Sequence, residues 1–338
     1  MKKAVLLVFF DRLENLKKVF EQVRIAQPPR LYLASDGPRE KITNEKEKVE
    51  EVRKWVLEHI DWKCDVKTRF LEKNSGGCAY GVSGAVTWFF ENEKDGIILE
   101  DDCVPCQSFF TYCEELLDKY KDNKKVWHIT GFGYYSNPKA KETYYFAKIQ
   151  HCWGWASWAD RWKYFSLDLT NWDDKNINKF SRHWVVRKFM RRLLKRLRES
   201  HPKETWAWPW AFWIVAHDGY CINPYKNLIS NIGLEGEHYQ GQDDGSNSLN
   251  KSTFELGKIV HPKKIRYNME AVDYIYEHHY EIPRSRVFGW EYNDKTKYKQ
   301  KVFRFLKLPV IRIKEYPKKK SVYFLGVKIR SKKDGCVI

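Results

Sequence analysis

Three adjacent carboxylates, Glu100, Asp101 and Asp102, directly follow the apolar run at residues 97–99. Like charges held this close repel one another, which costs stability unless a cation lies among them. A hard divalent ion such as Mn²⁺ or Mg²⁺ prefers carboxylate oxygens and bridges well to a diphosphate. A solvated acidic turn is the competing interpretation, so the place of these residues in the fold decides between the two.

Apolar runs alternate with helical periodicities along the chain as far as residue 130. We expect strands at residues 3–10, 30–34, 66–70, 95–99 and 126–130, and helices at residues 13–25, 46–59, 81–91 and 108–120. This alternation predicts an α/β fold with a Rossmann-like, mainly parallel central sheet and helices on both faces. Ligands bind beyond the carboxyl ends of such strands. Asp36 and residues 100–102 both follow predicted strands, so the two acidic regions converge on the predicted binding edge.

Basic residues are concentrated at one end of the chain. Residues 284–338 hold 17 Lys/Arg and 4 Asp/Glu, which accounts for +13 of the net charge of +17. We therefore expect one domain at residues 1–283 and a basic, aromatic-rich extension at residues 284–338. Cations mixed with apolar side chains suit an anionic membrane surface, and nucleic acid is the competing partner. Because the charge lies in one tail and no nucleic-acid-binding motif is recognised, we expect a membrane and no nucleic acid.

The apolar run at residues 4–10 is far shorter than the ~20 residues of a membrane span. Asp11 follows it without a small-residue cleavage site, so we interpret it as a buried strand of a cytosolic chain. The eight cysteines are scattered, and the Cys103/Cys106 pair has no second pair at zinc-finger spacing. We expect the cysteines to be free and reduced.

Five segments occur in an order that resembles one enzyme family. They read LASDGP at 33–38, EKNSGGC at 72–78, IILEDD at 97–102, HCWGWASW at 151–158 and NPYKNLISNIG at 223–233. Together they resemble GT-A glycosyltransferases of the EDD kind, including N-acetylglucosaminyltransferase I and bacterial surface-polysaccharide transferases. The resemblance covers about residues 3–240. It implies a GT-A fold and Mn²⁺- or Mg²⁺-dependent transfer of a sugar from a nucleotide-diphosphate donor, with UDP the expected carrier.

The resemblance also implies a setting for this reaction. The acceptor would be a hydroxyl of a glycan or lipid-linked molecule in bacterial surface-glycan (lipopolysaccharide-type) synthesis. The protein would lie in the cytoplasm, peripherally on the inner face of the plasma membrane, held there by the basic extension.

Roles carry over from the family to matching residues of this chain. Asp102 would bind the metal directly, and His238 would approach the metal or the diphosphate, although an ordinary loop histidine is the competing interpretation. Asp101 would face the ribose or metal, Glu100 the donor sugar, and Asp36 the base or ribose. The implied nucleotide-sugar-binding residues are Phe10, Arg12, Asp36, Asn74, Glu100, Asp101, Trp153, Gly154 and Trp155.

The catalytic base is where this chain departs from its relatives. Related bacterial chains carry Trp-Asp-x-x-Trp, whereas residues 205–210 read TWAWPW here, so Ala207 occupies the position of the expected aspartate. Either the chain is an engineered, catalytically disabled variant, or the base lies elsewhere, with Glu204 the nearest candidate. Trp206, Trp208 and Trp210 are expected either to line an acceptor groove or to belong to the core.

Other interpretations stay open at this stage. The basic amphipathic helix expected at residues 182–198 suits either a membrane interface or a surface helix packed on the core. A nucleotidyltransferase is a competing enzyme class, but residues 9–12 lack the glycine-rich loop that such enzymes need. A non-catalytic sugar-binding relative, or a basic membrane- or nucleic-acid-binding protein, is the remaining alternative.

Overall fold

The computed structural model describes residues 1–233, 250–280, 282, 288–295, 298–305, 308–316, 319–325 and 327–333. Contacts divide the chain into two compact units. The first comprises Met1–Arg182 and Val186–Ile282, and the second comprises His183–Val185 and Pro283–Ile338.

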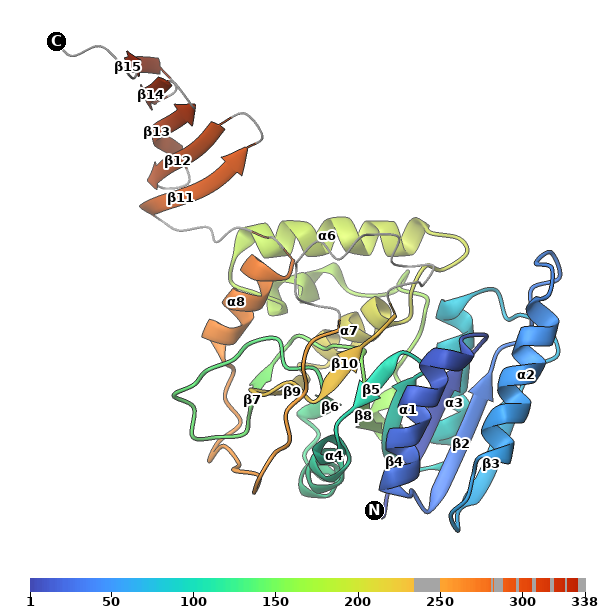
Figure 1. Cartoon of the computed structure of the whole chain (residues 1–338). Helices are drawn as coiled ribbons and strands as arrows, with labels where there is room; N and C mark the ends of the chain where they lie inside the picture. The colour runs from blue at the N-terminus through green and yellow to red at the C-terminus, as the bar shows by residue number, and fades with distance from the viewer. Residues whose placement is uncertain are drawn as a thin grey trace. The chain divides into compact units, whose positions relative to one another are not determined.

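An eight-stranded sheet forms the centre of the first unit, in the order β3-β2-β1-β4-β8-β6-β9-β7 (Figure 1). The strands β3, β2, β1 and β4 are mutually parallel, and β6 is parallel to β9, whereas β8 and β7 run antiparallel to their neighbours. The predicted α/β fold with a mainly parallel sheet is therefore confirmed. The strand bounds are Ala4–Phe9 (β1), Arg30–Ser35 (β2), Asp65–Phe70 (β3), Asp95–Glu100 (β4), Val126–Thr130 (β6), Tyr144–Ala147 (β7), Trp155–Trp158 (β8) and Tyr220–Pro224 (β9).

Helices cover both faces of the sheet because successive strand side chains point to opposite sides. From β1, Val5 and Leu7 pack in one core cluster with residues of α1, α2 and α4, whereas Ala4 and Leu6 pack in another with residues of α3 and α7. The strands are apolar on both faces, as expected of a parallel sheet buried between two helical layers. The helix bounds are Leu13–Ala26 (α1), Glu45–Glu58 (α2), Cys78–Asn92 (α3), Gln107–Tyr120 (α4) and Ala207–Ala216 (α7).

In the part that the structure describes, the second half of this unit holds a second, smaller sheet and four further helices. A small antiparallel sheet pairs β5 (Cys103–Pro105) with β10 (Ile229–Asn231), which joins the segment after β4 to a segment more than a hundred residues later. The remaining helices are α5 (Ala159–Trp162), a 3₁₀-helix (Asp174–Lys179), α6 (Trp184–Glu199) and α8 (Met269–His278).

The second unit contains a five-stranded antiparallel sheet in the order β11-β12-β13-β14-β15. Its last two strands form a hairpin, in which Phe324 of β14 pairs with Val327 of β15. No described helix of either unit is long and apolar enough to cross a membrane. The strand bounds are Phe288–Lys295 (β11), Tyr298–Phe305 (β12), Leu308–Tyr316 (β13), Lys319–Phe324 (β14) and Val327–Lys333 (β15).

Candidate functional site

The acidic cluster, defined as Glu100, Asp101 and Asp102, lies at the carboxyl end of the central strand β4. The end of β1 supplies its nearest partners, because β1 pairs with β4 in parallel. The backbone N–H of Phe10 donates to Asp101 Oδ2 at 3.2 Å, and the Arg12 guanidinium donates to Asp101 Oδ1. The other terminal nitrogen of Arg12 lies 3.0 Å from Asp102 Oδ2. Five predicted site residues therefore meet at one point.

The carboxylates of the acidic cluster are largely buried and repel one another, and Arg12 neutralises only part of their negative charge. Burial, followed by the charges of Asp102 and Asp101, raises the pKa of Glu100 to about 8. Burial, opposed by Arg12, raises the pKa of Asp101 to about 6. Among the described residues one guanidinium faces three carboxylates, so the cluster retains the ability to attract a further cation.

The late segment of the chain closes the cluster from the side of β10. The Asn231 side-chain amide donates to Asp102 Oδ1 at 3.4 Å, and the Ile232 N–H donates to the Asp102 carbonyl at 2.8 Å. A Cβ added at Gly233 would lie 2.4 Å from Asp102 Oδ2, so a glycine is required at this close approach. These contacts bring the NLISNIG segment onto the acidic cluster.

The Trp-Gly-Trp segment packs against β10 and β4, the strands at whose ends Asn231 and the acidic cluster lie. Gly154 has a φ of +56°, and a Cβ there would meet Ile229 Cδ1 at 2.4 Å. Trp155 is wholly buried in the core, with 0% of its surface exposed, and it begins β8 beside β4. Trp153 is only half-buried and packs edge-on against Phe132 at 4.8 Å between ring centroids. Of the two tryptophans, only Trp153 therefore has exposed ring surface for a ligand.

Asp36 lies at the end of β2, next to β1, and its carboxylate is engaged by backbone and hydroxyl donors. Oδ1 accepts from the N–H groups of Gly37 (2.8 Å) and Ser75 (2.9 Å), and Oδ2 accepts from the Ser75 hydroxyl (2.6 Å). The Asn74 amide donates to the Gly37 carbonyl at 2.9 Å, and its oxygen accepts from Gly76 at 3.0 Å. Asp36 and Asn74 therefore bind the loops after β2 and β3 together.

Arg53 of α2 is a positioning residue that the sequence did not reveal. Its guanidinium donates to the carbonyls of Ser35, Asp36 and Leu71 at 3.2, 2.9 and 2.8 Å. It thereby holds the carboxyl ends of β2 and β3 in place. The only signal in the sequence is a basic residue beside the apolar positions of a predicted helix.

The predicted acceptor-binding tryptophans occupy different environments. Trp206 and Trp210 are core residues, 2% and 0% exposed, and the Trp206 ring stacks on Trp155 at 5.4 Å. Trp208 is half-buried, with its ring 5.5 Å from that of Tyr280. Of the three, Trp208 is thus the one whose ring has accessible surface.

The two candidate base positions also differ. Ala207 begins α7, and its carbonyl accepts from the Gln150 amide at 2.9 Å. Glu204 is exposed, and its carboxylate pairs with Arg196 of α6 at 2.8 Å. That pairing directs Glu204 toward the basic surface of α6.

Three buried polar atoms near the Trp-Gly-Trp segment were not anticipated. Among the described residues, Gln150 Oε1, His151 Nε2 and Trp155 Nε1 are buried without a hydrogen-bond partner. Because buried polar atoms are nearly always paired, these three are candidates to bind a ligand or water. Of these residues, Trp155 was named from the sequence through its motif, whereas no spacing or periodicity marks Gln150 or His151.

The acidic cluster fits a divalent ion that completes its shell with phosphate and water oxygens. In the part of the chain that the structure describes, no three His, Cys, Asp or Glu side chains are arranged to hold a metal by themselves. Mg²⁺-type sites commonly use one or two carboxylates plus substrate phosphates. Asp102, with 17% of its side chain exposed, can supply such a ligand. His238 lies outside the described residues.

The seven cysteines among the described residues are free, as predicted. Their thiols are not activated, since burial raises the pKa of Cys78 to about 12 and that of Cys106 to about 11. Cys78 and Cys152 both lie within the electrostatic reach of Glu100. The raised pKa of both thiols means that neither serves as a nucleophile beside the acidic cluster.

Comparison with known proteins gives only distant structural matches. No family model and no curated protein matches the chain. It is similar to a mannosyltransferase from Pyrobaculum calidifontis in complex with GDP-Man and Mn²⁺ (9% identity, TM-score 0.30, 46% of this chain and 44% of that one). It is also similar to the glycosyltransferase GlyE of Streptococcus pneumoniae, with 10% identity, a TM-score of 0.31 and coverage of 62% of this chain and 42% of that one. A UDP-glucose pyrophosphorylase complexed with UDP-glucose matches with 12% identity, a TM-score of 0.31 and coverage of 58% of this chain and 88% of that one. The chain spans less than half the length of the first two, and the function is argued below from its own residues.

Proposed function

We propose that this protein is a metal-dependent glycosyltransferase of the GT-A type that uses a nucleotide-diphosphate sugar. The observation that carries the proposal is the meeting of distant segments at the carboxyl edge of the sheet. Asp102 contacts Arg12 after β1 and Asn231 at the end of β10, and Gly154 packs against Ile229 of the same strand. Three of the five segments that resemble one family therefore meet at the edge where α/β sheets bind ligands, which supports the proposal.

Each residue has a stated part in this proposal. Asp102 would hold Mn²⁺ or Mg²⁺, which supplies Lewis-acid stabilisation of the departing diphosphate. Arg12 pairs with both Asp101 and Asp102, so it fixes the orientation of these carboxylates. Glu100 would face the donor sugar, and Trp153 and Trp208 would offer half-exposed rings to the C–H faces of donor and acceptor sugars.

Calorimetric titration with UDP, GDP, dTDP and CMP, each with and without Mn²⁺, tests the donor site. We expect metal-dependent binding of one nucleotide, weakened at least about a hundredfold in Asp102→Ala. Asp118→Ala is the matched control, because Asp118 pairs with Lys3 and is 62% exposed. Failure of all four nucleotides to bind would overturn the proposal. Release of pyrophosphate from a nucleoside triphosphate and a sugar 1-phosphate would identify a nucleotidyltransferase instead.

Substitutions at Ala207 and Glu204 test which position supplies the catalytic base. An inverting transfer needs a carboxylate within reach of the acceptor hydroxyl, and such a base contributes roughly 10²–10⁴-fold. If position 207 is the base position, Ala207→Asp raises sugar transfer by orders of magnitude, whereas Glu204→Gln changes little. Unchanged turnover in Ala207→Asp together with loss in Glu204→Gln would move the base to Glu204.

The acceptor and setting extend the same proposal. We propose a glycan or lipid-linked acceptor in bacterial surface-glycan synthesis, with the basic extension on the anionic inner face of the plasma membrane. The +13 charge of residues 284–338 supports this, at roughly 1 kcal/mol per Lys/Arg near an anionic surface. The test is binding to anionic vesicles after lysines of this extension are replaced by glutamine. Unchanged binding would contradict the proposed role of the extension in membrane association.

A further inference from the structure

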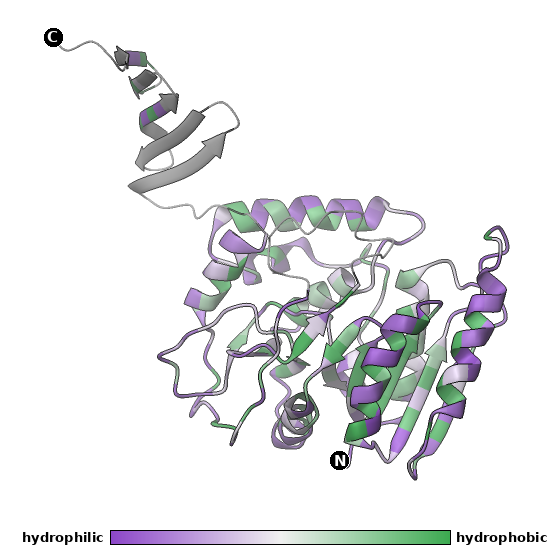
Figure 2. Cartoon of the chain, in the orientation of Figure 1, coloured by the Kyte–Doolittle hydropathy of each residue, from purple (hydrophilic) through white to green (hydrophobic). Residues whose placement is uncertain are grey.

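Helix α6 carries a strip of cations on one side. It holds seven Lys/Arg and a single acidic residue, Glu199. Residues three and four apart share a helix face, so the exposed basic side chains form a continuous row. Purple and green segments alternate along α6 in Figure 2, as expected of a helix with one polar and one apolar side. We define the α6 cationic strip as Lys188, Arg191, Arg192, Lys195 and Arg196, all of which are exposed.

The apolar side of α6 is already occupied. Its five buried residues are between 1% and 7% exposed and pack into the first unit: Val186, Met190, Leu193, Leu194 and Leu197. A helix that lies in a membrane interface must bury that side among acyl chains. The sequence left open whether this helix lies in a membrane interface or packs on the core, and the burial of its apolar side shows that it packs on the core. Any contact with a membrane is left to the charged side chains.

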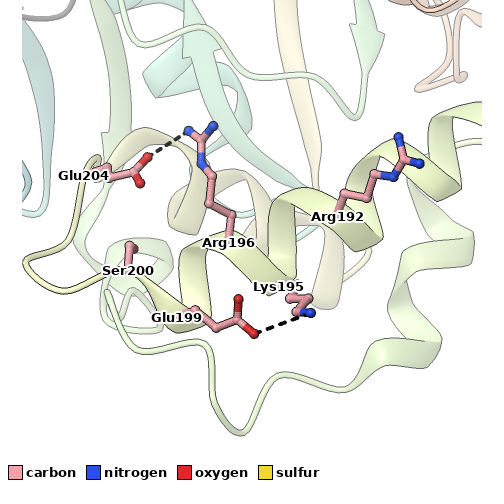
Figure 3. Close-up of a pocket in the computed structure, with 6 residues that line it drawn as sticks. All are labelled: Arg192, Lys195, Arg196, Glu199, Ser200 and Glu204. Carbon is pink, nitrogen blue, oxygen red and sulfur yellow. Dashed lines mark ion pairs between the residues drawn. The ribbon is translucent and has the colours of Figure 1, made fainter.

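A recess of about 380 Å³ opens along the last turns of the α6 cationic strip (Figure 3). Within it Arg196 lies 2.8 Å from Glu204, and Lys195 lies 3.8 Å from Glu199. Arg196 and Lys195 are 63% and 74% exposed, so water screens both pairs and they contribute little stability. An incoming phosphate can therefore compete for these cations. The recess is lined by Arg192, Lys195, Arg196, Glu199, Ser200 and Glu204.

The shape and composition of the strip favour one kind of anionic partner. Proteins that bind single-stranded nucleic acid interleave cations with aromatic stacking platforms. Between Lys188 and Arg196, the span of the strip, no exposed side chain is aromatic, and the exposed Trp184 lies at the start of α6, before the strip begins. The row follows one straight helix over about 12 Å from Lys188 to Arg196, at 1.5 Å per residue. A straight row of mobile cations matches a flat array of phosphate headgroups.

We propose that the α6 cationic strip binds an anionic phospholipid membrane by charge alone, without insertion of apolar side chains. This surface is separate from the basic extension and does not depend on the glycosyltransferase proposal. Charge-only binding weakens as the Debye length falls from about 10 Å at 0.1 M salt to about 3 Å at 1 M. The strip's contribution is therefore large at the lower salt concentration and absent at the higher one.

Co-sedimentation of the full chain with phosphatidylcholine vesicles, with and without phosphatidylglycerol, tests this proposal. We expect Arg192→Glu/Lys195→Glu to weaken binding to anionic vesicles at least about tenfold at about 0.1 M salt, and not at about 1 M. The matched control is Lys46→Glu/Lys54→Glu on α2, which makes the same charge change at side chains 72% and 75% exposed. The control should stay within about twofold of the unmodified chain.

Several results would overturn the proposal. Equal weakening in both double variants would mean that only net charge matters, and no weakening in either would mean that the strip does not touch the membrane. Duplex or single-stranded DNA that binds more tightly than vesicles, with the same dependence on Arg192 and Lys195, would assign the strip to nucleic acid. Unchanged melting temperature verifies folding of each variant, and Arg192→Gln/Lys195→Gln replaces the glutamate pair if it unfolds.

Discussion

Two strand ends at the carboxyl edge of the sheet, on either side of β1, hold carboxylates that differ in how far the fold satisfies them. At the end of β2, Asp36 has both carboxylate oxygens engaged by donors from Gly37 and Ser75. At the end of β4, three carboxylates share one guanidinium, and burial together with repulsion raises the pKa of Glu100 and Asp101. The first region is satisfied by the fold itself, whereas the second lacks positive charge.

This difference separates a structural acid from a binding acid. Both regions follow strands at the ligand edge, and position alone would assign a ligand to each. A carboxylate whose oxygens already accept three hydrogen bonds has little capacity left for a ribose or base, so we now favour a loop-bracing role for Asp36. The acidic cluster gains stability when a cation arrives, which is the property expected of a metal site.

The largest effect is expected from removing Arg12, the one cation that pairs with the acidic cluster among the described residues. Arg12→Ala leaves Glu100, Asp101 and Asp102 without a counter-charge, and breaking a largely buried pair costs roughly 3 kcal/mol. Chemical denaturation in EDTA measures this loss, and Mn²⁺ should restore much of it. Arg24→Ala is the matched control, since Arg24 also pairs with two carboxylates but on an exposed surface. A stable Arg12→Ala protein in EDTA would show that the cluster is not short of charge.

The sequence was sufficient for five strands of the large sheet, β1 to β4 and β6, and for the edge on which the acidic residues lie. Long apolar runs such as residues 30–34 and 95–99 are unambiguous, and the residues that follow them must lie at the carboxyl edge. The short strands β7 and β8, four residues each, were not predicted, because so few residues show no periodicity. The alternation of Lys with apolar residues in β12 was a usable signal for a strand that we did not exploit.

Side-chain partners between distant segments could not be predicted. The bond from Asn231 to Asp102 spans 129 residues, and it depends on the pairing of β5 with β10. Local spacing carries no information on such a pairing. The same limit applies to the tryptophans at 206, 208 and 210, since only the packing of α7 decides which rings are buried.

An intermediate effect is expected at the satisfied strand end. Asp36→Ala removes the acceptor of three hydrogen bonds and leaves two N–H groups unpaired, which costs about 2 kcal/mol. Mn²⁺ should not reverse this loss, in contrast to Arg12→Ala. Asp36→Asn is the conservative control, because its carbonyl oxygen can still accept from Gly37 and Ser75. The comparison fails if Asp36→Ala melts normally but no longer binds the nucleotide, since Asp36 would then be a ligand contact.

The smallest effect is a pH dependence that belongs to the acidic cluster alone. The pKa of Glu100 is raised in the folded protein to about 8, so the folded state binds more protons than the unfolded chain between about pH 5 and pH 8. The stability contributed by this group is complete below the unfolded pKa and is lost as the pH rises through about 8.

In EDTA, the free energy of unfolding should therefore fall with rising pH, and Glu100→Gln should remove about 1 kcal/mol or more of that fall. Denaturant titrations at pH 5, 6.5 and 8 measure it, with Glu93→Gln as a control at a strand-edge carboxylate paired to Arg30. Parallel curves for Glu100→Gln and the unmodified chain would mean that the charge at Glu100 costs nothing in the folded state, and the contrast between the two strand ends would lose its electrostatic basis.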